Sequence, residues 1–166
     1  HLPDVLLDVY NRETLDNYRP IKWLDPEVDD KYDMIAIGAG AGGLVSSIGS
    51  SMAGGKAAII ERNIFGGDWL NTGWVPSKAF IKSAKVAHTV RNADKYGVTV
   101  AGDVKIDFGK VMKRLRQIRA QISEHDSVHR MSKSFGLDVF LGEATFISPQ
   151  EIKVNNRILQ FSKACI

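Results

Sequence analysis

The sequence predicts an α/β fold whose parallel sheet begins with a βαβ unit. Residues 34–37 and 57–60 are short apolar runs of the kind found in buried parallel strands, and glycines follow the first run at once. The residues between the two runs, about 42–53, can form a helix whose packed side carries Leu44, Val45 and Ile48. A strand, a glycine turn, a helix and a second strand within about 30 residues indicate a right-handed crossover between parallel strands.

The rest of the chain predicts two longer helices and then a small antiparallel β meander. A helix is expected over residues 77–90, after Pro76, and the clearest amphipathic helix over residues 108–123. The apolar stripe of the second helix is formed by Val111, Leu115, Ile118 and Ile122. Its other face carries Lys110, Lys113, Arg114, Arg116 and Arg119, which we interpret as a solvated face in preference to a basic patch for a partner. After residue 136 the pattern becomes β-like, with a hairpin turn expected at Asn155–Asn156.

Composition excludes several classes of function. A chain of 166 residues with 44% hydrophobic and 25% charged side chains is typical of a globular domain with a sizeable core. The net charge of +3 is too small to predict binding to nucleic acid or to a membrane surface, and no apolar run is long enough to cross a bilayer. We therefore expect an intracellular protein, soluble or peripheral. Because the chain begins with histidine, a removed targeting segment and a mitochondrial or chloroplast location stay open.

The first 31 residues form an acidic leader, and residues 32–166 are expected to form the domain proper. Residues 1–32 hold eight acidic and four basic side chains, a net charge of −4, so the remainder carries +7. The leader has no sustained hydrophobic period, but its apolar side chains are too many for a solvated tail. We favour packing of this arm against its own domain, and the alternative is an arm that docks another protein subunit.

The glycine turn after the first strand has the spacing of a dinucleotide site. Gly38, Gly40 and Gly43 occupy the defining places of G-x-G-x-x-G: the first permits the tight turn, the second lets a pyrophosphate approach the backbone, and the third lets the helix sit close to the sheet. Glu61 lies 18 residues beyond Gly43, at the end of the second strand, where a carboxylate can bind the adenosine ribose. This acidic residue disfavours the 2′-phosphate of NADP, and spacing alone leaves NAD and FAD open.

The next segment, residues 66–78, reads GGDWLNTGWVPSK. It resembles the active-site motif GGxCxNxGCxPSK of the flavin-dependent pyridine nucleotide–disulfide oxidoreductases, a family that includes glutathione reductase, dihydrolipoamide dehydrogenase and mercuric reductase. The resemblance covers about residues 32–166, which correspond to the first part of the FAD domain of that family. The GGD and NTG variants resemble mercuric-reductase-like members more than lipoamide ones.

The resemblance implies a Rossmann-like FAD-binding domain and a set of cofactor contacts. It implies that Gly38, Gly40 and Gly43 hold the FAD pyrophosphate and that Glu61 holds the ribose. Gly67 and Asp68 would lie near the phosphates and the ribitol, and Lys78 beside the reactive edge of the flavin. The segment Gly142-Glu143-Ala144 looks like the backbone contact of the family to adenine.

Two departures separate this chain from a working member of the family. Trp69 and Trp74 stand where the family has its two redox cysteines, and an indole has no nucleophilic sulfur, so thiol–disulfide exchange through this segment is chemically impossible. In the family those cysteines face the flavin ring, so the resemblance implies two indoles that stack on the flavin or fill its place. The second departure is that the resemblance stops at Ile166, before the NAD(P)H domain and the dimerisation domain of the family.

Two explanations of the tryptophans stay open. One is an error or a nonstandard code in translating the gene, since the codons for tryptophan and cysteine differ by one base. The other is genuine loss of the disulfide in a pseudoenzyme.

Two functions follow as expectations. The first is the N-terminal FAD-binding portion of an NAD(P)H-dependent disulfide oxidoreductase-like flavoprotein, in which NAD(P)H would act only through a domain absent from this chain. The second is a catalytically inactive relative that serves as a structural subunit and binds other subunits through the leader. Under both expectations this chain has no catalytic residue and lacks the homodimer interface of the family.

Three further residues are weaker candidates for a site. His125 and His129 have the spacing of metal ligands on one helix face, but no carboxylate or thiol cluster completes a site, so we interpret them as surface histidines. Cys165 is the only cysteine, cannot form an internal disulfide, and lies in a predicted strand as an inert thiol.

Overall fold

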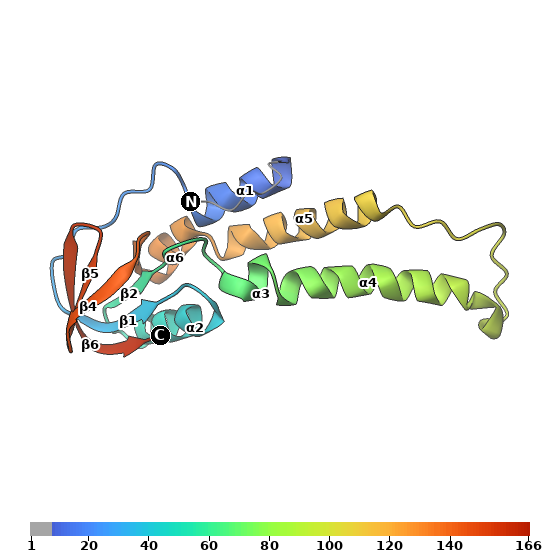
Figure 1. The fold of residues 1–166 in the computed structure, drawn as a ribbon. Helices are drawn as coiled ribbons and strands as arrows, with labels where there is room; N and C mark the ends of the chain where they lie inside the picture. The colour runs from blue at the N-terminus through green and yellow to red at the C-terminus, as the bar shows by residue number, and fades with distance from the viewer. Residues whose placement is uncertain (1–7) are drawn as a thin grey trace.

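The computed structural model describes residues 8–166 and shows a mixed sheet from which a long helical hairpin extends (Figure 1). The sheet has the strand order β3-β2-β1-β6-β5-β4. The strands are β1 (Tyr32–Ile37), β2 (Ala57–Ile60), β3 (Asp138–Phe140), β4 (Ala144–Ser148), β5 (Glu151–Val154) and β6 (Arg157–Cys165). The helices are α1 (Val9–Tyr18), α2 (Ala41–Met52), α3 (Gly67–Asn71), α4 (Trp74–Arg91), α5 (Phe108–His125) and α6 (Val128–Phe135), with a 3-10 turn, η1 (Ala93–Tyr96).

The sheet consists of a parallel part and an antiparallel meander that share one strand. β3, β2, β1 and the second half of β6 are parallel neighbours, whereas β4, β5 and the first half of β6 are antiparallel. The expected Rossmann-like α/β fold with a small meander is therefore confirmed. The two-residue turn at Asn155–Asn156 is also confirmed, because Val154 pairs with Arg157, and Asn155 has the positive φ (51°) that such turns favour.

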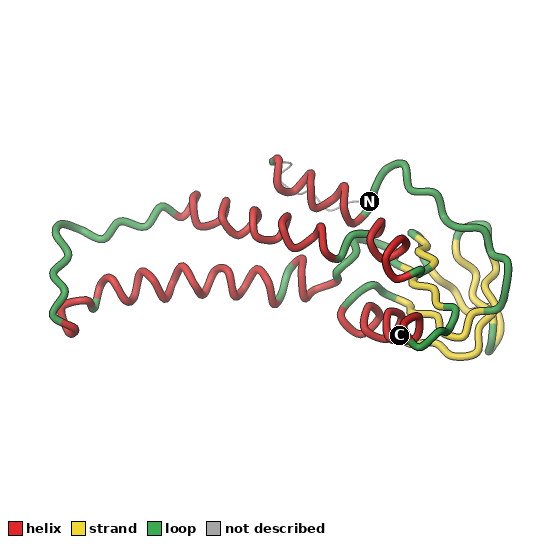
Figure 2. Tube along the Cα trace, turned by 180° about the vertical axis from the view of Figure 1, so that it is seen from behind, coloured by secondary structure: helices red, strands yellow, loops and turns green. Residues whose placement is uncertain are grey.

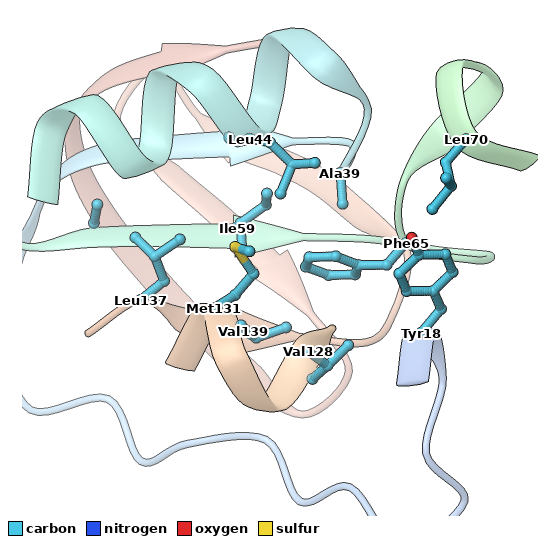
Figure 3. Packing of buried hydrophobic residues seen from close by; sticks show 12 residues of the cluster. Tyr18, Ala39, Leu44, Ile59, Phe65, Leu70, Val128, Met131, Leu137 and Val139 are labelled. Carbon is cyan, nitrogen blue, oxygen red and sulfur yellow. The ribbon is translucent and has the colours of Figure 1, made fainter. Parts of the chain in front are cut away.

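Side-chain alternation along the parallel strands builds a separate core on each face of the sheet. Along β2, Ala57 and Ile59 join one buried cluster, and Ala58 and Ile60 join the other. On the first face, α2 contributes Leu44, and the neighbouring α6 brings further apolar side chains onto Ile59 (Figure 3). The meander covers the second face with its own apolar residues, Ile152, Val154, Leu159 and Phe161.

The expected packed side of α2 is partly wrong. Leu44 is buried and Ile48 is partly buried against the core, but Val45 is 73% exposed. Ser47 is fully buried instead, and its hydroxyl donates to the carbonyl of Gly43 at 2.7 Å. A small polar residue that satisfies its hydroxyl within its own helix allows close contact with the sheet, and hydrophobic spacing alone does not reveal this.

Helix α5 crosses the middle of the molecule and is flanked by α1 and α4 (Figures 1 and 2). Part of the face expected to be solvated is therefore covered. Arg116 forms an ion pair with Asp8, the N-cap of α1. Arg114 donates to the carbonyl of Ala79 in α4 at 3.1 Å, whereas Lys110 and Lys113 are exposed. The sequence interpretation thus holds for the two lysines and for Arg114, which is exposed although it makes this contact, and fails for Arg116, which is partly buried.

The leader contains a helix that the hydrophobic pattern did not predict. Among its described residues, the buried positions of α1 are Asn11, Thr14 and Tyr18, two of which are polar. Tyr18 packs beside Phe65 and Leu70 in the first core (Figure 3). The described part of the leader thus packs against its own chain, while residues 1–7 lie outside the described part.

Candidate dinucleotide-binding site

The glycine turn connects β1 to α2 and needs its first glycine for backbone geometry. Gly38 has φ +101°, a conformation that side chains disfavour, and its N–H donates to the carbonyl of Ile60 at 2.8 Å. Gly43 lies so close to the turn that a Cβ there would overlap the carbonyl oxygen of Gly38. These two glycines let α2 sit directly on the end of the sheet.

Gly40 has a different environment from its neighbours. It is the N-cap of α2 with extended backbone, and a Cβ added to it would meet no atom within 4 Å. Gly40 is therefore not required by packing inside the protein. It leaves bare backbone at the start of a 12-residue helix, where unpaired N–H groups and the helix dipole favour an anion.

Glu61 binds the glycine turn to the loop that follows β2. One carboxylate oxygen accepts from the N–H of Ala39 at 2.8 Å, and the other accepts from the N–H of Asn63 at 2.7 Å. The side chain is almost buried, yet it lies at the wall of a cavity. Because each carboxylate oxygen can accept more than one hydrogen bond, Glu61 keeps the capacity to bind a ligand hydroxyl.

The start of α3 rests on the glycine turn from the other side. The N–H of Gly66 donates to the carbonyl of Ala39 at 2.9 Å, and Gly67 has φ +51°. A Cβ on Gly67 would come within 2.8 Å of the Cα of Gly40. Asn71 secures this short helix by donating to the carbonyls of Phe65 and Gly67 at 2.8 and 3.0 Å.

These segments enclose a cavity of about 510 Å³ at the carboxyl edge of the parallel strands. A cleft in this place and of this size is typical of ligand sites in open α/β sheets. The cavity brings together seven of the nine residues that the sequence proposed for cofactor binding, namely Gly38, Gly40, Glu61, Gly67, Asp68, Gly142 and Ala144.

The other two proposed residues lie elsewhere. Gly43 is buried beneath the turn, and Lys78 lies on α4, where its ammonium is 5.4 Å from the ring centre of Trp74. The sequence missed Arg62 and Asn63, which also line the cavity, whereas Glu143 belongs to the segment 142–144 that the resemblance implies at the adenine. The positions of Arg62 and Asn63 directly after Glu61 were the only available signal, because their residue types do not indicate a site.

The two tryptophans occupy unlike environments on either side of the break between α3 and α4. Trp69 is partly buried against the first core, and its indole N–H is buried without a hydrogen-bond acceptor. Trp74 begins α4 and is 65% exposed. The two rings thus differ in exposure, and their stacking on a flavin stays a prediction.

The remaining candidates do not form a site. The ring of His129 packs edge-on against Trp23, with centroids 5.3 Å apart, and Cys165 lies in β6 beside Ala36 of β1. Among residues 8–166 no group of three or more His, Cys, Asp or Glu side chains is arranged to hold a metal ion. Over the same residues, no helix has the length and apolar character needed to span a membrane.

Comparison with known proteins agrees with this geometry. The family described as "Pyridine nucleotide-disulphide oxidoreductase" matches residues 32–166. The chain belongs to this family. The matched region begins at the first residue of β1 and leaves the leader outside.

Curated relatives of the chain carry the name dihydrolipoyl dehydrogenase. The protein from Acholeplasma laidlawii is 35% identical over 136 residues, which cover 82% of this chain and 40% of the relative. The protein from Rhizobium etli is 38% identical over 125 residues (75% and 26%), and that from Bacillus subtilis is 35% identical over 119 residues (72% and 24%). The chain therefore spans about a quarter to two fifths of the length of these relatives. The finer likeness to mercuric reductases stays a prediction.

Proposed function

We propose that this chain is the FAD-binding portion of a flavoprotein of the disulfide oxidoreductase family whose disulfide relay is absent. The cavity that unites the glycine turn, Glu61, the start of α3 and the segment 142–144 carries the proposal. FAD supplies hydride and electron transfer chemistry when bound. Use of NAD(P)H would belong to parts of the relatives that this chain does not span.

The residues present fit an adenine dinucleotide. The open backbone at Gly40 and the N-terminus of α2 would bind the pyrophosphate, and Glu61 would accept hydrogen bonds from the ribose. The segment from Gly142 to Ala144 would offer backbone groups to the adenine. Asp68 at the cavity and Lys78 on α4 would lie on the flavin side, as in the family.

The redox relay of the family has no counterpart here. Thiol–disulfide exchange requires a thiolate that attacks a sulfur atom, and neither Trp69 nor Trp74 supplies sulfur. Mass spectrometry of the peptide over residues 66–78 from the authentic source tests this point directly. Masses that fit cysteine at both positions would restore the relay and overturn this part of the proposal.

A matched pair of variants tests the cofactor proposal. Gly40→Val fills the bare backbone without straining it, because the extended conformation of Gly40 suits any residue. We expect the purified wild-type chain to show a flavin absorbance band and to bind added FAD. The variant should lose at least about tenfold in affinity while it still unfolds cooperatively, with a stability loss of about 1 kcal/mol because valine is a poorer N-cap than glycine. Gly49→Ala, an exposed change on the same helix, is the control and should bind FAD normally. A wild-type chain that stays colourless with FAD would refute the proposal.

A structural subunit is the second candidate, and one surface favours it. The loop at the far end of the α4–α5 hairpin exposes several large apolar side chains, namely Tyr96, Val98, Val100, Ile106 and Phe108. Clustered exposed apolar residues are typical of association surfaces. A colourless chain that copurifies with a larger assembly, and loses it when Val98 and Ile106 become serine, would support this function over the first.

A further inference from the structure

We propose that the leader, residues 8–31, is a strap that positions the three segments forming the rim of the dinucleotide cavity. These rim segments are the loop at residues 62–63, helix α3, and the loop at residues 141–144. The proposal rests on the proposed FAD function of that cavity. The leader lies outside residues 32–166, the range that matches the family.

The first contact of the strap holds the loop that follows β2. Arg19, the residue that ends α1, donates from one guanidinium nitrogen to the carbonyls of Arg62 and Asn63 at 3.0 and 2.6 Å. Both of those residues line the cavity next to Glu61. One leader side chain thus fixes two consecutive peptide groups at the place where the ribose is expected to bind.

The second contact holds the loop expected at the adenine. One carboxylate oxygen of Asp25 accepts from the N–H of Leu141 at 3.1 Å, and the other accepts from the amide nitrogen of Asn155 at 2.6 Å. Asn155 packs so tightly on Gly142 that a Cβ there would overlap its side chain. Asp25 therefore holds Asn155 and the backbone before Gly142 as one unit.

The third contact reaches α3 through α5. Asn11 of α1 accepts from the guanidinium of Arg119, and the same guanidinium donates to the carbonyl of Asn71 at 3.1 Å. Asn71 in turn holds the carbonyl of Gly67 at 3.0 Å. Contacts from the leader thus reach all three rim segments, which lie on separate parts of the chain.

A rim that is ordered before binding favours affinity. Loops that become ordered only when the ligand binds lose conformational entropy in that step, and this loss weakens binding. Two of the three rim segments lie outside helices and strands except for Ala144, the first residue of β4, so repeating backbone hydrogen bonds hold little of them. The strap orders them before the ligand arrives. Arg19 and Asp25 are thus positioning residues that need not touch the cofactor.

Two leader variants test the strap in the full 166-residue chain. Asp25→Ala removes both acceptors, and Arg19→Met keeps the aliphatic stem but removes the donors. We expect each to raise the Kd for FAD about tenfold, measured by titration of protein fluorescence. Asp16→Ala and Arg12→Met are matched controls, because these exposed residues of α1 change charge in the same way without touching the rim.

A paired exchange separates positioning from general damage. Asn155→Asp alone places two carboxylates together, so repulsion replaces the hydrogen bond between positions 25 and 155. The double variant restores one donor and one acceptor, while the amide oxygen introduced at position 25 can still accept from the N–H of Leu141. Asn155→Asp should weaken FAD binding, and the double variant with Asp25→Asn should return to within about threefold of wild type.

Amide hydrogen exchange distinguishes failure of the strap from failure of the FAD proposal. Faster exchange at residues 62–63 and 141–144 in Asp25→Ala and Arg19→Met than in the controls is expected without any ligand. Unchanged exchange there, or wild-type Kd values in both folded variants, would overturn the strap. A wild-type chain that does not bind FAD would overturn the proposed function, whatever the exchange shows. A variant that fails to fold leaves the decision to the paired exchange.

Discussion

The glycine turn and the α3–α4 segment face the same end of the sheet, yet they have kept the features of their family to different degrees. In the turn, Gly38 and Gly43 satisfy packing demands and Gly40 leaves bare backbone beside the cavity. In the α3–α4 segment, the glycines and Asn71 hold the backbone, but Trp69 and Trp74 stand at the two positions that the motif resemblance assigns to the redox cysteines. The groups suited to binding are present and the groups suited to sulfur chemistry are missing.

The largest expected effect concerns the packing glycine of the turn. Gly43→Ala would force the added methyl group into the carbonyl of Gly38, so α2 has to move away from the sheet. We expect a loss of about 3 kcal/mol or more in the free energy of unfolding, measured by urea denaturation. Gly42→Ala is the control, since its Cβ meets nothing within 4 Å and alanine favours a helix. Equal stability of the two variants would contradict the described packing of the turn.

The two tryptophans should differ when each is truncated. Trp69→Ala removes an indole packed against the core and should cost about 2 kcal/mol in unfolding free energy. Trp74→Ala removes a ring that is mostly exposed and lies under the ammonium of Lys78, so it should cost about 0.5 kcal/mol. Similar losses for both would show that the two positions are equivalent after all.

A third variant at Trp69 sharpens the same comparison. Trp69→Phe keeps an aromatic ring in place and removes the buried N–H that has no acceptor. Removing that unsatisfied donor should recover part of the stability lost with the smaller ring. The unfolding free energy of the variant should therefore lie within about 1 kcal/mol of wild type in the same denaturation experiment. A loss as large as that of Trp69→Ala would indicate that the N–H has an acceptor in solution.

The smallest expected effect lies outside both regions, at the C-cap of α5. Burial raises the pKa of Asp126, and the charges of Arg130 and His125 only partly oppose this. The ionised carboxylate is therefore destabilising in the folded protein, and Asp126→Asn should raise the Tm near neutral pH. Because its pKa is raised, Asp126 takes up a proton at a higher pH in the folded wild type than in the unfolded chain. The difference in Tm between Asp126→Asn and wild type should therefore shrink as the pH falls through the raised pKa towards 3.8. Melting curves across this range, with Asp16→Asn as the exposed control, check the sign, and a lower Tm for Asp126→Asn would refute it.

Hydrophobic pattern and glycine spacing were sufficient to predict the βαβ unit, the two long helices and the meander. They were sufficient because strands β1 and β2 are apolar runs and α5 has a regular stripe. Helix α1 escaped prediction because it buries Asn11 and Thr14, whose burial depends on Arg119 and on the carbonyl of Tyr10. Thr14 satisfies its hydroxyl within α1, and the partner of Asn11 is 108 positions away, so neither burial leaves a periodic hydrophobic signal.

The cavity residues that belong to short local motifs could be predicted from the sequence. Spacing identified Gly38, Gly40 and Glu61, and resemblance added Gly67 and Gly142. The opposite environments of Trp69 and Trp74 were not predictable, because the chain breaks its helix between Asn71 and Trp74 and so turns the second indole outwards. The contacts of Arg19 and Asp25 with the rim were likewise invisible, since they join residues more than 40 positions apart.

The pairing of β1 with β6 can form only late in the synthesis of the chain. Tyr32 at the start of β1 pairs with Phe161, and Ala36 with Cys165, so β1 waits for its neighbour until nearly the whole stretch has left the ribosome. Pairings this distant in sequence form slowly, and an unpaired strand edge is a place where nascent chains aggregate. We therefore expect the edge of β1 to be the part of the nascent chain most exposed to aggregation until β6 is made.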